Sequence, residues 1–112
     1  MIVATARLVV EPKQRKALWE TVRGLLGPKR FEKGSLGYHL YQDCEDQNVF
    51  YLVEEWSTQA DLERHICSKD YTRILAAMDM CSEAPEIKFC TVSHTRGMDF
   101  LHETRGSDHT NG

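Results

Sequence analysis

Hydrophobic and polar positions alternate in four segments of the chain, and this alternation predicts four β-strands. The segments cover residues 2–10, 36–43, 49–56 and 87–94. Only a short polar stretch, residues 44–48, separates the second segment from the third. We therefore expect these two strands to form a hairpin.

Apolar residues at helical spacing predict one helix after the first strand and two helical pieces after the third. Pro12 suits the first turn of the first helix, and the pair Gly27-Pro28 is expected to end or kink it. Ser57 or Thr58 is expected to cap the next helical region. The apolar stripes are Leu18, Val22, Leu25 and Leu26 in the first helix, Leu62 and Ile66 in the second, and Tyr71, Ile74, Leu75, Met78 and Cys81 in the third.

The order of these elements is β-α-β-β-α-β, which is the ferredoxin-like arrangement. It predicts an α+β fold with one antiparallel sheet and helices on one face of that sheet. Residues 1–95 are expected to form this single domain. Residues 96–112 are polar and glycine-rich, and we expect a C-terminal tail outside the fold, attached by Met98, Phe100 and Leu101.

The strand predicted over residues 49–56 is apolar on both faces, so both faces of the sheet need a cover. Tyr51 and Val53 alternate there with Phe50 and Leu52. The helices cover only one face, and a bare apolar face would expose a large patch to water. The simplest cover is a second copy of the same sheet, so we expect a homodimer with twofold symmetry.

Charge and composition narrow the range of functions. The chain has 112 residues with 14 basic and 17 acidic side chains, and its formal net charge of −3 disfavours a nucleic-acid groove or an anionic membrane surface. No apolar run approaches the ~20 residues that span a bilayer, and the first residues lack the basic segment of a signal peptide. We therefore expect a cytoplasmic protein with no nucleic-acid or membrane partner.

The cysteines and histidines show no spacing typical of a metal site. The four cysteines include no CxxC pair, and we expect reduced thiols, most of them buried as small hydrophobic side chains. They are Cys44, Cys67, Cys81 and Cys90. The sequence therefore predicts no metal, and it contains no nucleotide-binding motif.

Two stretches of the chain carry the pattern of a known family. Residues 34–43 read GSLGYHLYQD, and residues 52–71 read LVEEWSTQADLERHICSKDY. They resemble the antibiotic biosynthesis monooxygenase (ABM) domain, in which Gly-x-hydrophobic-Gly-Tyr precedes Glu-x-Trp and Leu-x-x-His. The matching residues are Gly34, Leu36, Gly37, Tyr38, Leu40, Glu54, Trp56, Leu62 and His65. The resemblance covers about residues 1–95.

The resemblance implies a dimeric α+β barrel with a pocket between the sheet and the helices of each subunit. Members of known activity include oxygenases that need neither metal nor flavin and act on phenolic or quinol substrates. Such an enzyme needs a base, an aromatic wall and donors for the developing oxyanion. The leading hypothesis is therefore a cofactor-independent monooxygenase that uses O2 on a phenolic, quinol or polyketide-like aromatic substrate.

Five residues are candidates for this chemistry. His65 is the candidate base, because an unperturbed imidazole titrates near pH ~6.5 and His65 lies at the edge of a helical apolar stripe. Trp56 offers an aromatic wall and an indole N–H donor. Tyr38, Tyr71 and Arg73 are candidate substrate-binding residues. The alternative role of the three aromatic residues is core packing, and that of His65 is a solvated or capping position.

Several other features of the sequence bear on the function. Glu54 and Glu55 are expected to face solvent or to pair with Arg or Lys. Asp70-Tyr71 stands where many family members have a His-Phe pair. The absence of that histidine removes one proton shuttle. Leu75 stands where haem-degrading relatives carry an axial histidine, which disfavours haem degradation.

Two other functions remain open at this point. One is a non-catalytic small-molecule-binding dimer of the same fold. The other is an isomerase or lyase that acts on a small oxygenated metabolite and needs the same proton shuttle without O2.

Overall fold

The computed structural model of the protein describes residues 1–29 and 32–110. The strands are β1 (Ile2–Val9), β2 (Ser35–Gln42), β3 (Val49–Trp56) and β4 (Glu86–Thr91), and the helices are α1 (Arg15–Lys29), α2 (Gln59–Ile66), α3 (Tyr71–Asp79) and α4 (Met98–Thr110). A short 3-10 turn, η1 (Pro12–Gln14), precedes α1. The strands form one antiparallel sheet in the order β2-β3-β1-β4, which confirms the predicted ferredoxin-like α+β fold.

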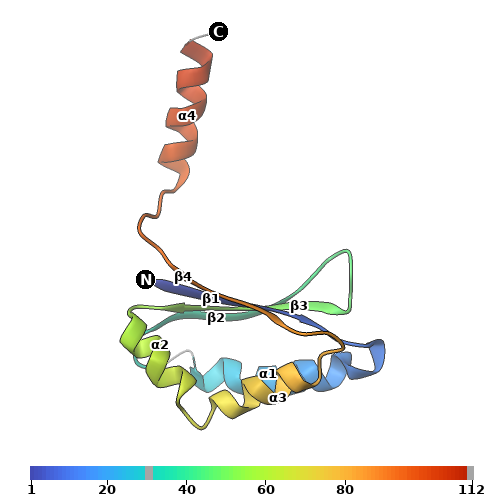
Figure 1. Ribbon diagram of the computed structural model, residues 1–112. Coiled ribbons are helices and arrows are strands. Elements are labelled where there is room, and N and C mark those ends of the chain that lie inside the picture. Colours follow the sequence, from blue (N-terminus) through green and yellow to red (C-terminus); the bar gives the residue numbers. More distant parts are fainter. Residues whose placement is uncertain (30–31, 111–112) are drawn as a thin grey trace.

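The helices α1, α2 and α3 lie on one face of the sheet, and the core fills the space between the two layers (Figure 1). Alternate residues of β1, from Ile2 to Leu8, are buried in this space. The register places them opposite alternate residues of β3, so that Ala6 pairs with Leu52 and Leu8 with Phe50. The period-two pattern of both strands therefore supplies one side of the core.

Local chemistry sets the ends of two helices. Thr58 caps α2, because its side-chain oxygen accepts a hydrogen bond from the backbone N–H of Asp61, and this confirms the predicted N-cap. The Gly27-Pro28 pair does not end α1, which continues to Lys29. A proline so close to a helix end removes only one backbone hydrogen bond, and its fixed φ is compatible with the helix. No helix in the described part of the chain is long and apolar enough to cross a membrane.

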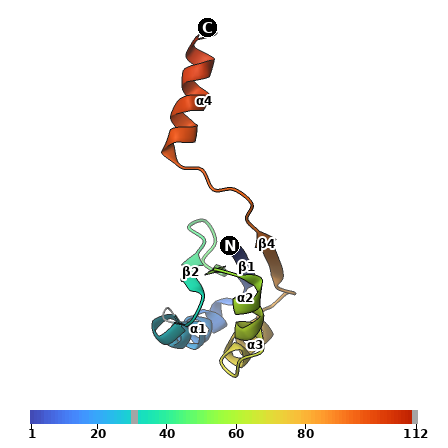
Figure 2. The same ribbon diagram turned by 90° about the vertical axis from the view of Figure 1, so that its left-hand side faces the viewer.

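The second face of the sheet carries no helix (Figure 2). It presents Thr5 and Arg7 of β1 beside Tyr51 and Val53 of β3, all of them half-buried. The strand β3 therefore does have apolar side chains on both faces, but the uncovered face mixes them with polar groups. The homodimer expected from this face stays a prediction.

The helix α4 stands away from the domain, on the side of the sheet opposite α1, α2 and α3 (Figures 1 and 2). Residues 92–97 connect it to β4. The radius of gyration is 17.3 Å, against ~13 Å for a compact chain of this length. The segment expected as a tail thus contains a helix, and the side chains expected to attach it, those of Met98, Phe100 and Leu101, are exposed.

The prediction that most cysteines are buried is wrong. Cys44, Cys67 and Cys90 are exposed, and Cys81 is half-buried. Cys44 lies in the β2–β3 turn and Cys67 follows the last residue of α2, so neither position faces the core.

Candidate functional site

His65 lies in the interior of the protein, enclosed by three aromatic side chains. Only 1% of its surface is exposed. Its ring stacks on that of Trp56, with 4.6 Å between the ring centroids and 29° between the planes. The rings of Tyr38 and Tyr71 meet the imidazole edge-on, with centroid distances of 6.0 and 5.3 Å. Three of the other four candidate residues therefore surround the ring of His65.

Two carboxylates approach the two ring nitrogens of His65. Oε1 of Glu54 lies 2.8 Å from Nε2, and Oε2 of Glu32 lies 3.1 Å from Nδ1. The contact with Glu32 has the geometry of a hydrogen bond, whereas the contact with Glu54 is short but poorly aligned and is an ion pair when the ring is charged. We call these six residues the His65 cluster: Glu32, Tyr38, Glu54, Trp56, His65 and Tyr71.

The proton count of the His65 cluster follows from the chemistry of imidazole. A neutral ring has one N–H donor and one acceptor nitrogen, so it can donate to Glu32 or to Glu54 but not to both. A second proton, on the ring or on a carboxylate, makes both contacts attractive. An imidazole between two carboxylates supplies the types of group that general acid–base chemistry uses.

The same geometry bears on metal binding. The two nitrogens of His65 point in different directions, so Glu32 and Glu54 do not converge with the ring on a single point. Within the described ranges, no group of three His, Cys, Asp or Glu side chains could hold a metal ion.

Strand pairing positions much of the cluster. Glu54 and Trp56 are two residues apart on β3, so both point to the helix-covered face of the sheet. Tyr38 of β2 is the register partner of Glu54 and shares that face. His65 follows Leu62 by three residues on α2, and both are buried on the side of the helix that faces the sheet.

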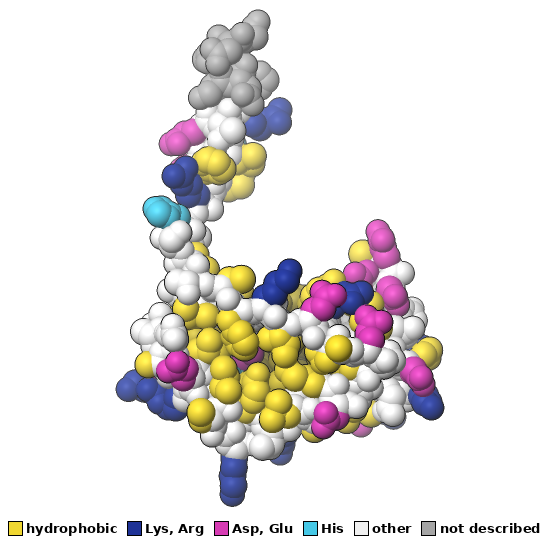
Figure 3. All heavy atoms as spheres, in the orientation of Figure 1, with side chains coloured by type: hydrophobic (Ala, Val, Ile, Leu, Met, Phe, Trp, Pro, Cys, Tyr) yellow, Lys and Arg dark blue, Asp and Glu magenta, His cyan; other side chains and the backbone are white. Residues whose placement is uncertain are grey.

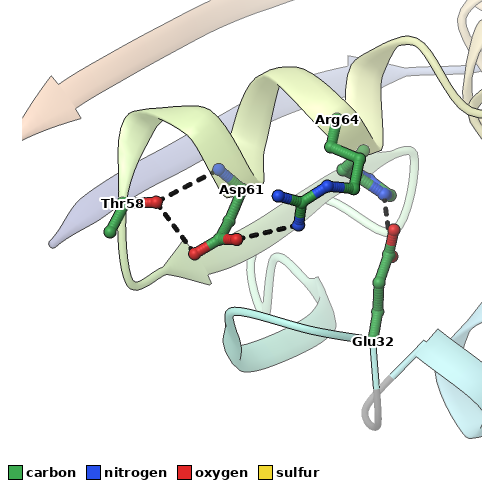
Figure 4. Close-up of polar contacts among 5 residues, drawn as sticks. Glu32, Thr58, Asp61 and Arg64 are labelled. Atoms are coloured by element: carbon green, nitrogen blue, oxygen red, sulfur yellow. Dashed lines mark hydrogen bonds and ion pairs between the residues drawn. The ribbon is translucent and has the colours of Figure 1, made fainter.

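Glu32 reaches His65 from the loop before β2, which lies against the start of α2 (Figure 4). Gly34 in this loop has φ of +84°, in the left-handed region that favours glycine. A Cβ at Gly34 would overlap the carboxylate of Asp61. The carbonyl of Gly34 accepts a hydrogen bond of 2.8 Å from the backbone N–H of Ser57. The position of Glu32 therefore depends on glycine at residue 34.

The first turn of α2 is held by a chain of polar contacts (Figure 4). The Thr58 hydroxyl donates to Oδ2 of Asp61 at 2.8 Å, and Nη1 of Arg64 donates to Oδ1 at 2.9 Å. These two donors, Thr58 first, hold the pKa of Asp61 below its usual value. The turn thereby presents a fixed surface to the loop that carries Glu32.

Two buried donors of the cluster have no partner among the described residues. They are the hydroxyl of Tyr38 and the indole Nε1–H of Trp56. Burial, reinforced by the charge of Glu54, raises the pKa of Tyr38, and burial also raises that of Tyr71. Tyr38 therefore keeps its proton at neutral pH. Both donors are available to an oxygen atom of a ligand, and an unpaired buried donor otherwise costs about 1–3 kcal/mol.

The structure departs from the expected site in three respects. Arg73 is exposed and lies against Gly24 of α1, outside the His65 cluster. The expectation that Glu54 faces solvent or pairs with Arg or Lys is wrong, because the Glu-x-Trp spacing places it on the buried face beside Trp56. Glu32 was not predicted at all, and its only signal in the sequence is its place two residues before Gly34.

Side chains fill the space directly around His65. The open space nearby lies outside the His65 cluster. A groove of about 320 Å³ runs between α2 and β4; we call it the β4 groove. Its lining residues are Ile2, Gln59, Leu62, Glu63, Ile66, Phe89 and Thr91. Ile2 and Leu62 also pack against Trp56, so the β4 groove adjoins the cluster. A cavity of about 530 Å³ lies at the other end of the sheet, where Arg15 and Trp19 of α1 face the β2–β3 hairpin.

Comparisons with known proteins agree with this fold. Residues 1–77 match the family model described as antibiotic biosynthesis monooxygenase. YcnE of Bacillus subtilis (strain 168), whose name proposes a monooxygenase, is 29% identical over 65 residues, which are 58% of this chain and 68% of YcnE.

Solved structures show the same architecture. PA3566 from Pseudomonas aeruginosa is 29% identical, with a TM-score of 0.72 over 83% of this chain and 94% of that one. A protein from Deinococcus radiodurans, described as a proposed antibiotic biosynthesis monooxygenase, is 16% identical and shares the fold, with a TM-score of 0.79 over 87% of this chain and 97% of that one. By its sequence match and its fold, the chain belongs to the antibiotic biosynthesis monooxygenase family.

Proposed function

We propose that the protein is a cofactor-independent monooxygenase that acts on a phenolic, quinol or polyketide-like aromatic substrate. The observation that carries this proposal is the buried imidazole of His65, which lies between two carboxylates and beside two unpaired donors. Such a reaction needs three things from a protein: a base, a group that stabilises the protonated base, and hydrogen-bond donors for an oxyanion.

The proposed reaction begins when Nε2 of His65 accepts the hydroxyl proton of the substrate, and Glu54 stabilises the imidazolium. The substrate anion passes one electron to O2, and the two radicals join at the ring carbon opposite the hydroxyl to give a hydroperoxide. Loss of water then leaves a quinone. A phenol with a hydrogen on that carbon and one O2 thus give one quinone and one water, so atoms and electrons balance.

The two unpaired donors have a role in this scheme. The hydroxyl of Tyr38 and the indole N–H of Trp56 would bind the developing phenolate or the hydroperoxide oxygen. We place the substrate ring at the inner end of the β4 groove, beside Ile2, Leu62 and Ile66, which pack with Trp56; the ring reaches His65 when these side chains move aside. A groove of about 320 Å³ is in the range of small-molecule sites.

Oxygen uptake tests the proposed activity. A panel of phenols and quinols is supplied in buffer containing a chelator, and uptake of O2 and formation of quinone are followed together. We expect one O2 per product, one ¹⁸O atom in the product when ¹⁸O2 is used, and a loss of about 100-fold or more in His65→Ala. His94→Ala, at an exposed residue outside the cluster, is the matched control. Absence of uptake with every substrate, or full activity in His65→Ala, would contradict the proposal.

The protein is also proposed to act as a homodimer joined through the uncovered face of the sheet. Support comes from the half-buried Tyr51 and Val53 on that face, which a second sheet would cover. Light scattering coupled to size-exclusion chromatography at micromolar concentration should give the mass of two chains. A monomer in this measurement would contradict the dimer.

One observation favours a second candidate function, which is ligand binding without catalysis. The interior around His65 is filled by side chains, with Trp56 and Tyr38 fully buried. If panel compounds raise the melting temperature while no O2 is consumed, this second function replaces the first. Turnover of a compound without O2 would instead identify an isomerase or lyase.

A further inference from the structure

Besides the uncovered sheet face, the described residues expose two apolar surfaces on opposite sides of the sheet. One is the helix-facing side of β4, where Ile87 and Phe89 are exposed and Phe89 lines the β4 groove. Figure 3 shows hydrophobic side chains gathered on this face, below β4 and over the helices. Because β4 is an edge strand, the three helices do not reach over it.

The other uncovered surface is on α4. Met98, Phe100 and Leu101 are 62%, 47% and 47% exposed. Met98 and Leu101 are three positions apart and lie on the same side of the helix, with Phe100 next to Leu101. The guanidinium of Arg96 lies 5.1 Å from the centre of the Phe100 ring, beside the first turn of α4, which stands away from the sheet (Figure 1).

We propose that α4 of each chain docks on the exposed apolar surface along β4 of a second copy, over the partner's β4 groove. The inference rests on the face-to-face homodimer of the proposed function and adds to it the element that closes the groove. Each chain would then supply one helix and receive one.

The direction of the chain supports a second copy as the occupant. After β4, residues 92–97 leave the sheet on its uncovered side, and α4 stands on that side in both views (Figures 1 and 2). The chain's own β4 groove opens on the opposite, helix-covered side. A second sheet packed face to face would lie ~10 Å above the first. Six linker residues span up to ~20 Å, so α4 stands at the level of the second copy's sheet and helices.

The sizes of the two surfaces also agree. A helix of 13 residues is ~20 Å long, and a strand of six residues extends over a similar ~20 Å. The apolar residues themselves occupy shorter stretches: Met98, Phe100 and Leu101 lie within the first ~5 Å of α4, and they would meet Ile87 and Phe89, which are ~7 Å apart on the partner's β4.

This docking changes the candidate site. Ile2, Leu62 and Ile66 line the β4 groove and pack in one cluster with Trp56. The helix α4 of the second copy would cover the β4 groove. The open groove would then become an enclosed apolar pocket beside the His65 cluster. The pocket of each subunit would then contain side chains from both chains.

Photocrosslinking between isotopically distinct chains tests the docking. The photoreactive amino acid p-benzoylphenylalanine replaces Leu101 in full-length ¹⁵N-labelled protein, which is mixed with unlabelled protein, allowed to exchange and irradiated. We expect mixed-isotope crosslinks from position 101 to β4, α2 or α3. The matched control places the same amino acid at Glu103, which is ~200° around the helix from Leu101 and should give few such crosslinks.

Each outcome decides the proposal. Crosslinks to β4 that join only residues of the same chain would show that α4 folds back on its own domain, and would overturn it. Absence of crosslinks to this surface in a sample that light scattering shows to be dimeric would overturn the docking alone. A monomeric protein would overturn both the docking and the face-to-face dimer.

A pair of variants provides an independent measurement. Leu101→Asp and Phe89→Ser change exposed side chains, so both variants should keep the fold of the domain. Circular dichroism would check this. We expect each substitution to raise the dissociation constant of the dimer about tenfold. The double variant should have nearly the same dissociation constant as either single variant, because both substitutions act on one contact. Wild-type affinity in both variants would overturn the proposal.

Discussion

Nε2 of His65 and Oε1 of Glu54 lie 2.8 Å apart in the interior of the protein, one carried by α2 and the other by the central part of the sheet. Both side chains are almost fully buried, so the contact is shielded from water. It joins two of the buried polar side chains across the space between α2 and the sheet. Several consequences of it can be measured.

Glu54→Gln should impair the proposed reaction while keeping the shape of the site. The amide cannot stabilise an imidazolium, so the turnover rate is expected to fall by about 100-fold or more. Glu55→Gln changes the neighbouring residue on the other face of β3 and should leave turnover unchanged. Equal rates in the two variants, measured by O2 uptake, would show that Glu54 has no part in proton transfer.

His65→Ala should destabilise the fold itself. It leaves Glu54 buried without its partner and opens a cavity against Trp56, and together these effects should lower the free energy of unfolding by roughly 3 kcal/mol or more. Urea denaturation followed by circular dichroism gives this value. A loss below about 1 kcal/mol would mean that Glu54 is already neutral or hydrated in the folded protein.

Tyr38→Phe separates stability from activity. The Tyr38 hydroxyl has no partner among the described residues, so its removal should leave the free energy of unfolding unchanged or raise it by about 1 kcal/mol. If the hydroxyl binds an oxygen of the substrate, turnover should fall in the same variant. A variant that is both less stable and fully active would contradict this assignment.

Gly34→Ala should displace the loop that carries Glu32. Alanine disfavours φ of +84°, and its methyl group would overlap the Asp61 carboxylate, so a loss of roughly 2 kcal/mol in unfolding free energy is expected. Gly106→Ala, at a helical position of α4 with open space around it, should instead be neutral or stabilising. Two variants of equal stability would show that the loop adapts without cost.

The contribution of Asp61 to stability should depend on pH. Its pKa is lowered in the folded protein by the hydrogen bonds from Thr58 and Arg64, so folding favours the ionised form. This stabilisation is complete above the unfolded-state pKa of ~3.9 and is lost as the pH falls through the lower folded-state pKa. Asp61→Asn should therefore be less stable than the wild type at pH 7, with the difference shrinking below pH ~4. Urea titrations at pH 7 and pH 2.5 would detect it, and a difference independent of pH would contradict this account.

The fold could be predicted from the sequence because its determinants are local. The alternation over residues 49–56 gives the strand and both of its faces, and Thr58 marks the start of α2. The helix α4 could not be predicted in this way. Its residues include Gly106 and few apolar side chains, so neither a stripe nor helix propensity indicates a helix there.

The candidate site could be predicted only in part. Spacing along one strand and one helix brings Trp56 and His65 together, and these positions are visible in the sequence. Arg73 follows Tyr71 by two residues and so lies ~200° around α3 from it, away from the cluster. Glu32 depends on the course of a loop, which no local pattern encodes.

The two carboxylates beside His65 are held by elements of different stiffness. Glu54 belongs to a strand that is paired on both sides, whereas Glu32 belongs to a loop, and its side chain is 19% exposed against 7% for Glu54. The imidazole therefore separates an inner acceptor from an outer one that touches water. In the proposed reaction, a proton taken up at Nε2 would leave to solvent through Nδ1 and Glu32. Proton movement through the ring would then have a direction, from the sheet outward to the loop.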